Sequence, residues 1–376
     1  MKNIPSPISP KRTGFSGLMK RWFNVDSVVE MPRQTTGYYA DTAYRPDRIP
    51  AQSPQHEDHN QSALERFGTA RLPWGHTELV VPIFIFAKAP PKLLRWYEEH
   101  GDPLEGTGYQ GQMDHECFRY APLAKRFQLL NLAEIFSRLT VLVLGPLMIL
   151  TLIIGSFLTS KSNYWHSLVY DEWLSTALIF GIPIGTWLIS RVLAKFCLGW
   201  FLKAGKGPLW ELNRRTGMVT VWTYPPKFPF IPRGKPEVFK APFVEFDAWV
   251  STRGDRAGIL NRLHLFHRYS TCEAGVGAVG GATSMPEPCY ALWDFVQNYM
   301  DVTQPLPDIP IWEAYRHLDP VTAEHDRQTN RPERYWRDMD DDTFKACERE
   351  MHNRVRALST LGRPNIMAEK TVYASY

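Results

Sequence analysis

The stretch from Leu139 to Ser160 constrains this chain most, because it carries no charged residue. As a helix, about 22 residues at 1.5 Å each reach roughly 33 Å, enough to cross a bilayer core of about 30 Å. A second uncharged run, Leu174–Ser190, becomes long enough if Arg191 and Lys195 extend to the head groups. We therefore expect a transmembrane hairpin, with spans at about 137–159 and 174–196 and a short external loop at 160–173.

The basic residues that flank these spans predict the orientation of the hairpin. Lys125, Arg126 and Arg138 precede the first span, and Arg191, Lys195, Lys203, Lys206, Arg214 and Arg215 follow in or after the second. The external loop has Lys161 as its only Lys or Arg. Because basic residues are retained on the cytoplasmic side, we expect a multi-pass protein of the bacterial inner membrane with both termini in the cytoplasm.

Composition narrows the function classes. The chain has 376 residues and a formal net charge of +4, which is modest for this size and leaves no strong footprint for nucleic acid. Its five cysteines lie far apart and form neither a disulfide framework nor a CxxC metal pair. The partners expected from composition are therefore the lipid bilayer and protein, not nucleic acid.

The chain before the first span divides into two predicted parts, both cytoplasmic. Residues 1–76 mix Pro, Ser, Gln, His and charge with little periodicity, which predicts a mostly irregular arm. Residues 77–134 form a small α/β segment. In it, Glu78–Lys88 has the Val, Ile and Phe content of a strand, interrupted by a proline, and Pro90–His100 has the apolar side of a short helix.

The predicted hairpin occupies residues 135–196. The chain after it is predicted to be β-rich. Pro208–Leu212 and Met218–Trp222 read as a hairpin whose turn ends at Gly217. Further strands are expected within 238–250 and 260–266, followed by an amphipathic helix at Pro288–Met300. The domain should span 197–302, with 303–376 as a tail that holds one helix, about Asp341–Leu358. The predicted fold class is an α+β membrane protein: a two-helix transmembrane hairpin plus a cytoplasmic antiparallel β-rich domain capped by a helix, pleckstrin-homology-like at fold level.

Several residue groups resemble chemical sites without meeting their requirements. Gly275, Gly277 and Gly280 spell GxGxxG, but no helix follows directly. His264 and His267 would lie on opposite faces of a strand. The cluster Asp338–Asp342 lacks the glycine and distal Glu of a calcium loop, and its place before a helix indicates capping. We therefore predict no catalytic residue, no cofactor and no metal site.

The segment Leu209–Trp222, continued by Ala241–Asp247 and Leu263–Arg268, resembles a family of uncharacterised two-span bacterial inner-membrane proteins found near type VI secretion and toxin genes. The resemblance covers roughly Phe136–Met300. Its motifs are structural, so it transfers no functional residue. It implies an immunity or accessory role.

Two functions follow as hypotheses. The first is a non-enzymatic inner-membrane protein that binds a protein partner, a toxin or a secretion component, and homo-oligomers are compatible with it. The alternative is a lipid- or ligand-sensing membrane protein whose basic cytoplasmic domain contacts anionic lipid. The expected lipid contacts are Lys203, Lys206, Arg214 and Arg215.

Overall fold

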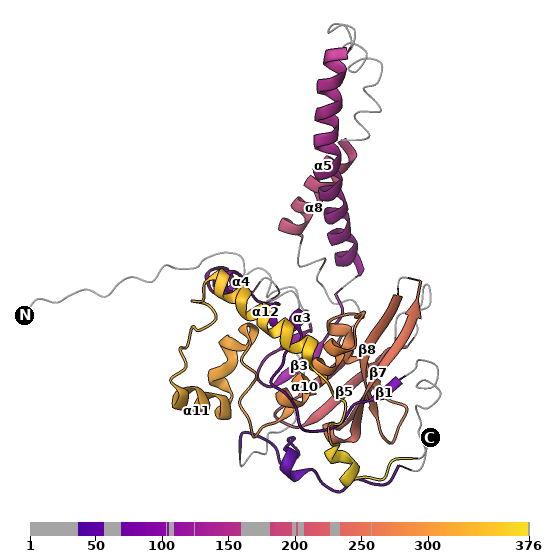
Figure 1. The fold of residues 1–376 in the computed structure, drawn as a ribbon, viewed down its shortest axis with the longest axis vertical. Coiled ribbons are helices and arrows are strands. Elements are labelled where there is room, and N and C mark those ends of the chain that lie inside the picture. Colours follow the sequence, from indigo (N-terminus) through magenta and orange to yellow (C-terminus); the bar gives the residue numbers. More distant parts are fainter. Residues whose placement is uncertain are drawn as a thin grey trace, which may run out of the picture. The chain divides into compact units, whose positions relative to one another are not determined.

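Two antiparallel sheets form the β part of the fold (Figure 1). The first has five strands in the order β2-β3-β4-β5-β6. Its strands are β2 (Gln112–Met113), β3 (Cys117–Tyr120), β4 (Trp210–Asn213), β5 (Met218–Thr223) and β6 (Glu237–Pro242). The hairpin predicted around Gly217 is confirmed, because β4 pairs with β5 and the turn between them contains this glycine at φ 66°.

The second sheet has four strands in the order β1-β7-β8-β9. They are β1 (Thr69–Arg71), β7 (Phe246–Asp255), β8 (Gly258–His267) and β9 (Glu273–Ala274). The strand predicted at 260–266 is therefore confirmed as β8. The run predicted at 238–250 is split, because the one-turn 3-10 helix η4 (Phe243–Glu245) follows Pro242 and passes the chain from β6 in one sheet to β7 in the other.

The computed structural model describes residues 37–55, 69–102, 104, 109–123, 125–158, 181–197, 201, 207–225, 234–256 and 258–374. From Tyr38 onward the chain forms one compact unit. Besides η4, four further 3-10 segments lie within its described residues: η1 (Pro46–Arg48), η5 (Val276–Val279), η6 (Pro310–Leu318) and η7 (Ile366–Glu369).

Helix α10 (Glu287–Met300) lies at the centre of the core and confirms the helix predicted there. It is buried on more than one side: Trp293, Phe295 and Tyr299 are wholly buried. Phe118 of β3 contacts both Phe295 and Tyr299, with ring centroids 6.2 and 6.0 Å apart. The helix is therefore surrounded, rather than capping one open sheet as the pleckstrin-homology analogy required.

The domain division predicted from the sequence does not match this core. Tyr44 and Trp74, placed in the irregular arm of residues 1–76, are buried beside Phe243. The tail predicted at 303–376 holds α11 (Pro320–Thr329) and α12 (Asp341–Ala357), and α12 packs against α10. Both regions belong to the same hydrophobic core as the sheets, because their apolar residues are needed to cover α10.

The segment Glu78–Lys88 was predicted as a strand, and this is wrong. It contains α3 (Ile83–Phe86), a single helical turn that begins after Pro82. The carbonyl of Pro82 accepts hydrogen bonds from the N–H groups of Ile85 and Phe86, so a helical turn starts at this proline. Because proline has no N–H, it could not have donated a hydrogen bond to a neighbouring strand. The next helix, α4 (Pro91–His100), confirms the prediction for that stretch.

The two-helix transmembrane hairpin is also wrong. Among the residues that the structure describes, one helix, α5 (Lys125–Leu158), has a segment long and apolar enough to cross a membrane by length and composition. The other helix, α8 (Ile182–Phe196), has 15 residues, which reach roughly 22 Å. The first part of the predicted second span, residues 174–180, lies outside the described residues, and Pro183 stands in the first described turn of α8. The predicted external loop lies outside the described residues.

The helices α5 and α8 pack against each other (Figure 1). Many of their described large apolar side chains are exposed. Leu142 and Ile189 are 62% and 61% exposed, whereas Ser137 and Ser190 are 7% and 3% exposed. A helix pair in water does the reverse, because its apolar stripe faces the core.

The register of the five-stranded sheet fixes where these helices attach. Tyr120, the last residue of β3, pairs with Trp210, the first of β4, so the chain leaves for α5 and returns from α8 at one end of the sheet. We call this the helix-proximal end. The end of β5 and the start of β6 also lie there, because Thr223 pairs with Glu237. The β4–β5 turn lies at the opposite, helix-distal end.

Candidate functional site

The β4–β5 turn positions two consecutive arginines at the helix-distal end of the five-stranded sheet. Asn213 holds the turn, because its Oδ1 accepts hydrogen bonds from both the N–H and the hydroxyl of Thr216, each at 2.9 Å. Within this turn Arg214 points into the protein and Arg215 stays at the surface, with side chains 0% and 20% exposed. The two arginines therefore serve different purposes.

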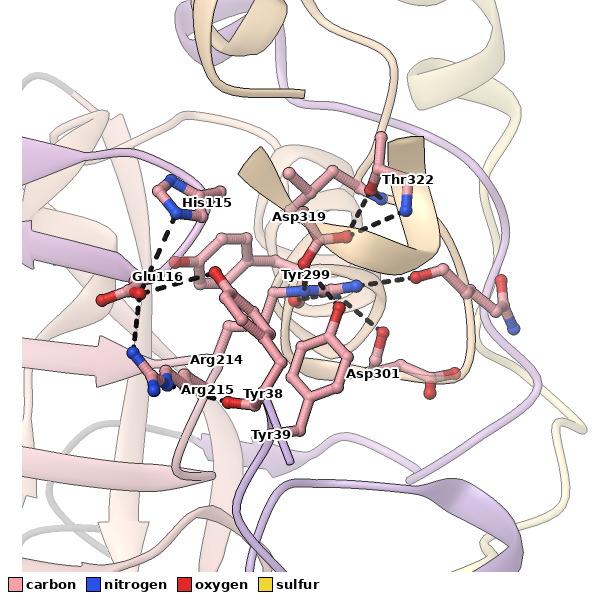
Figure 2. A network of polar contacts seen from close by, with 12 residues as sticks. Tyr38, Tyr39, His115, Glu116, Arg214, Arg215, Tyr299, Asp301, Asp319 and Thr322 are labelled. Atoms are coloured by element: carbon pink, nitrogen blue, oxygen red, sulfur yellow. Dashed lines mark hydrogen bonds and ion pairs between the residues drawn. The ribbon is translucent and has the colours of Figure 1, made fainter. Parts of the chain in front are cut away.

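Arg214 joins three parts of the fold from inside (Figure 2). Its guanidinium donates to the carbonyls of Asp301, at 2.8 Å, and Gln304, at 2.7 Å, both just beyond α10, and also to that of Tyr299 near the end of that helix. Its Nε lies 3.3 Å from Oδ1 of Asp319. A cation near the C-terminal end of a helix is favourable, so Arg214 satisfies carbonyls that α10 leaves without helical partners.

Asp319 is the acidic counterpart of Arg214 and is wholly buried as well. It caps the N-terminus of α11, because its Oδ2 accepts a hydrogen bond from the N–H of Thr322 at 3.1 Å and another from the hydroxyl of that residue. The hydroxyl of Tyr39 donates to Oδ1 at 2.6 Å. Burial and this hydrogen bond raise the pKa of Tyr39, which keeps its phenol a neutral donor.

Glu116 gathers a second set of contacts nearer the surface (Figure 2). Nη1 of Arg215 lies 3.1 Å from Oε1 of Glu116, and Nε2 of His115 lies 3.9 Å from the same oxygen. The hydroxyl of Tyr38 also donates to it, at 3.4 Å, and burial together with the charge of Glu116 raises the pKa of this phenol. The side chain of Arg215 is held further by the carbonyl of Tyr38 at 2.8 Å.

These contacts support a surface that we call the aromatic rim. Its residues are Tyr38, His115, Arg215, Tyr315 and Leu318. His115 stacks beside Tyr315, with ring centroids 6.3 Å apart and an interplanar angle of 19°. Tyr315 and Leu318, both in η6, are 37% and 44% exposed. Tyrosine, arginine and exposed apolar side chains on a rigid base are typical of protein interfaces.

The phenols of the rim are not activated. Burial raises the pKa of Tyr38 and of Tyr315, so both phenols stay neutral donors. Arg214, beneath the rim, is buried against Asp319. In the described ranges, no group of three His, Cys, Asp or Glu residues could hold a metal ion. Burial and the nearby charges of Glu211 and Asp114 raise the pKa of the Cys117 thiol to about 12, so it is not an activated nucleophile.

The residues predicted to contact lipid have three different outcomes. Lys203 and Lys206 lie outside the described residues. Arg214 is removed from the prediction, because a wholly buried guanidinium cannot reach a head group. Arg215 is engaged by Glu116 and lies at the helix-distal end, away from the attachment of α5. Sequence spacing could not separate the two arginines, since only the tertiary fold buries one of them.

The histidines singled out from the sequence are placed as structural residues. His264 is partly exposed, with its Nδ1 2.5 Å from Oε1 of Glu273 across the β8–β9 pair. His267 is buried, with Nε2 3.0 Å from Oε2 of Glu245. Ser270 Oγ lies 3.0 Å from Nδ1 of His267, so the serine and the carboxylate stand at the opposite ring nitrogens from those they occupy in a Ser-His-Asp triad. Nδ1 also accepts the N–H of Tyr269 at 3.2 Å, so these bonds lock the turn after β8.

The other predicted clusters have local roles. Asp340 caps α12, accepting hydrogen bonds from the N–H groups of Asp342 and Thr343 at 3.0 and 2.9 Å. The glycine-rich stretch forms η5, and Gly277 packs directly on the backbone of Leu263, where a side chain would not fit. Neither cluster forms a ligand site.

A cavity of about 340 Å³ lies beside η6 and α11. Its arginines are already paired: Arg316 makes two hydrogen bonds to Asp326 at 2.7 and 2.6 Å, and Arg331 makes two to Asp308 at 2.9 and 2.8 Å. Within each bidentate pair, the arginine and the aspartate neutralise each other's charge. The cavity therefore contains ion pairs rather than a site for an anion.

No family model, curated protein or solved structure matches this chain. The resemblance to two-span membrane proteins found near secretion genes therefore stays a prediction.

Proposed function

We propose that this chain is a membrane-anchored, non-enzymatic protein whose β-rich body binds a protein partner. The observation that supports anchoring most directly is the outward-facing apolar surface of α5 and α8, which encloses Ser137 and Ser190. A core helix of a soluble protein is mostly buried, whereas 12% of the apolar window Lys125–Leu147 is buried. Burial in lipid removes such an apolar surface from water.

The pairing of β3 with β4 supports a body that lies on one side of the bilayer. These strands precede and follow the helices in the chain, yet they are hydrogen-bonded neighbours in one sheet. Whatever part of α5 enters the bilayer, β3 and β4 therefore stay together on one side of it. The same pairing argues against a cleaved leader, since removal of α5 with the chain before it would take β1, β2 and β3 away. Lys125, Arg126 and Arg138 favour the cytoplasmic face of an inner membrane for that side.

The aromatic rim is the proposed partner surface. It lies at the helix-distal end, where the anchor does not reach, and its arginine and rings are held in place by Glu116. Such preorganisation lowers the entropy lost on binding. A toxin or secretion component is the partner that the resemblance implies, with an immunity or accessory role for this chain.

Tags at the two ends of the full chain test the membrane arrangement. In cells, an epitope before Met1 and another after Tyr376 should both be protected from an impermeant protease until the inner membrane is opened. Tags on opposite sides, or a chain that is recovered without membrane, would contradict the proposal.

Crosslinking in detergent extracts tests the partner surface. The full chain should capture a protein that is lost with Leu318→Asp, which puts a charge in the rim. Leu361→Asp is the matched control, because Leu361 is 93% exposed and lies outside the rim. Equal capture by both variants, or no captured protein at all, would overturn the rim as a partner site.

A further inference from the structure

Strand β6 of the five-stranded sheet has a free edge. It is last in the strand order and pairs on one side with β5, from Glu237 opposite Thr223 to Pro242 opposite Met218. In the described part of the chain, no backbone hydrogen bond reaches β6 from its other side. Unpaired N–H and C=O groups along such an edge are a template for a further strand.

Two hydrogen bonds of β5 and its ends show which way each backbone group points. The N–H of Trp222 donates to the carbonyl of Leu209 on the β4 side, and the carbonyl of Gly217 accepts from the N–H of Phe243 on the β6 side. Both backbone groups of a residue point to the same side of a strand, and the side alternates along the chain. Even-numbered residues of β5 therefore face β4, and odd-numbered residues face β6.

The register carries this alternation into β6 and makes its free edge symmetrical about Phe239. Because odd-numbered residues of β5 lie opposite odd-numbered residues of β6, the backbone groups of Val238 and Lys240 are left at the free edge. Each of these two residues offers one donor and one acceptor. Pro236 and Pro242, three residues to either side of Phe239, have no N–H to offer.

This symmetry matches the edge to a second copy of itself. In an antiparallel pair centred on Phe239, Val238 lies opposite Lys240 of the second copy, and the two residues exchange both hydrogen bonds. A slip by two residues in either direction leaves a carbonyl of Val238 or Lys240 facing a proline, which cannot donate. One of these slips also places Lys240 opposite Lys240 of the second copy, and like charges directly opposite are destabilising.

The side chains suit the same register. The ring of Phe239 lies 6.5 Å from that of Phe246 and 4.9 Å from that of His267, so it points to the inner face of the sheet. Two copies of Phe239 then form an aromatic cross-strand pair, which is favourable. On the outer face, the aliphatic part of Lys240 covers Val238 of the second copy, a residue that is 54% exposed in the single chain.

We propose that β6 is the interface between two copies of this chain, which join their five-stranded sheets into one continuous antiparallel sheet across a two-fold axis at Phe239. This axis is perpendicular to the sheet. When it coincides with the bilayer normal, both copies of α5 can enter the same bilayer. The interface is independent of the aromatic rim, so Leu318→Asp should leave it intact.

Disulfide crosslinking of the full chain tests the register. A copy with Val238→Cys and one epitope tag is co-expressed with a copy that has Lys240→Cys and a second tag, and the detergent extract is oxidised mildly. The two Cα atoms should lie about 5.5 Å apart, within the range of a disulfide. We expect dimers with both tags several-fold above the wild-type level, for which the five native cysteines set the background.

Val238→Cys in both copies is the matched control. Its two Cα atoms are diagonal neighbours at roughly 7–8 Å, too far apart for a disulfide, so the product should stay at background. Equal crosslinking in the two arms would overturn the register. A mixed arm at background, or capture of a different protein through residue 238 instead of a second copy, would overturn the self-pairing.

Val238→Pro tests the pairing without a new cysteine. The N–H of Val238 has no partner in its own chain, so a proline there should leave the urea midpoint close to that of the wild type. It should convert the dimer to a monomer in multi-angle light scattering of the purified chain in detergent, whereas Val238→Ala should stay dimeric. A monomeric wild type, a dimeric Val238→Pro chain or an unfolded one would each contradict the proposal, the last because it would show that this N–H is bonded within the sheet.

Discussion

The Nε of Arg214 lies 3.3 Å from Oδ1 of Asp319, and neither side chain is exposed. The pair connects the β4–β5 turn to the cap of α11, across 105 residues of sequence. It also lies directly beneath the aromatic rim, because Tyr39 donates to the same Oδ1 and stands next to Tyr38 in the chain. The rigidity of the rim therefore depends on this buried ion pair.

Arg214→Met should destabilise the protein by about 3–5 kcal/mol, because it leaves Asp319 buried without its cation and removes donors from three carbonyls. Urea unfolding of the full chain in detergent measures the loss. Arg215→Met is the control and should cost about 1 kcal/mol or less, since the pair of Arg215 with Glu116 is partly solvated. Similar losses in the two variants would contradict the assigned roles.

Stability should fall as the pH is lowered below about 6.5, the ordinary pKa of an unfolded histidine. Burial lowers the pKa of His267 in the folded state, and the carboxylate of Glu245 offsets this only in part. The unfolded chain therefore binds a proton first, and stability is lost as the pH falls toward the folded pKa. The slope from this residue is at most about 1.4 kcal/mol per pH unit.

His267→Gln removes the titrating group and should flatten the change in urea midpoint between pH 7.5 and pH 5.5. His264→Gln is the comparison, because His264 is partly exposed beside Glu273. A slope unchanged by His267→Gln would show that other groups dominate the acid sensitivity.

Gly217→Ala should release the segment that carries Tyr38 of the rim and Tyr39 beneath it. Gly217 has φ 66°, a conformation that costs other residues about 1–2 kcal/mol. In addition, a Cβ there would collide with the carbonyl oxygen of Thr42. Trypsin should then cleave after Arg48 much faster than in the wild type. Gly254→Ala has open space and should leave the cleavage rate unchanged.

Ser190→Leu should separate α8 from α5, because Ser190 is 3% exposed where the helices pack. Overpacking of this kind costs about 1–3 kcal/mol. Hydrogen exchange over residues 182–196 in nanodiscs should accelerate, whereas Ser190→Ala should behave like the wild type. If the leucine is tolerated, the serines are not interface residues.

The sequence predicted correctly the elements that are determined by residues close together in the chain. Gly217 marks the β4–β5 turn because of its positive φ, and Asp340 marks the start of α12 because it caps that helix. The strand predicted at Glu78–Lys88 failed for a physical reason. A short apolar run with Val, Ile and Phe fits a buried strand or a buried turn equally well, and the contacts around Ile85 and Phe86 decided for the turn.

The candidate site was beyond the reach of sequence patterns. Its partners are far apart, with Tyr39 and Asp319 separated by 280 residues and Tyr38 and Glu116 by 78. In the sequence, Arg214 could not be distinguished from its neighbour Arg215, which does lie at the surface. The two-span hairpin failed because an uncharged run does not by itself make a spanning helix, and of the described helices α5 alone has a segment long and apolar enough.

The pairing of β3 with β4 also sets an order of events during synthesis. Arg119 of β3 and Glu211 of β4 are 92 residues apart, which at 5–20 residues per second is an interval of about 5–18 s on the ribosome. In that interval α5 is synthesised before β4 exists to pair with β3. Sheet closure therefore follows the synthesis of α5, and during the delay β3 has to be shielded from pairing with foreign strands.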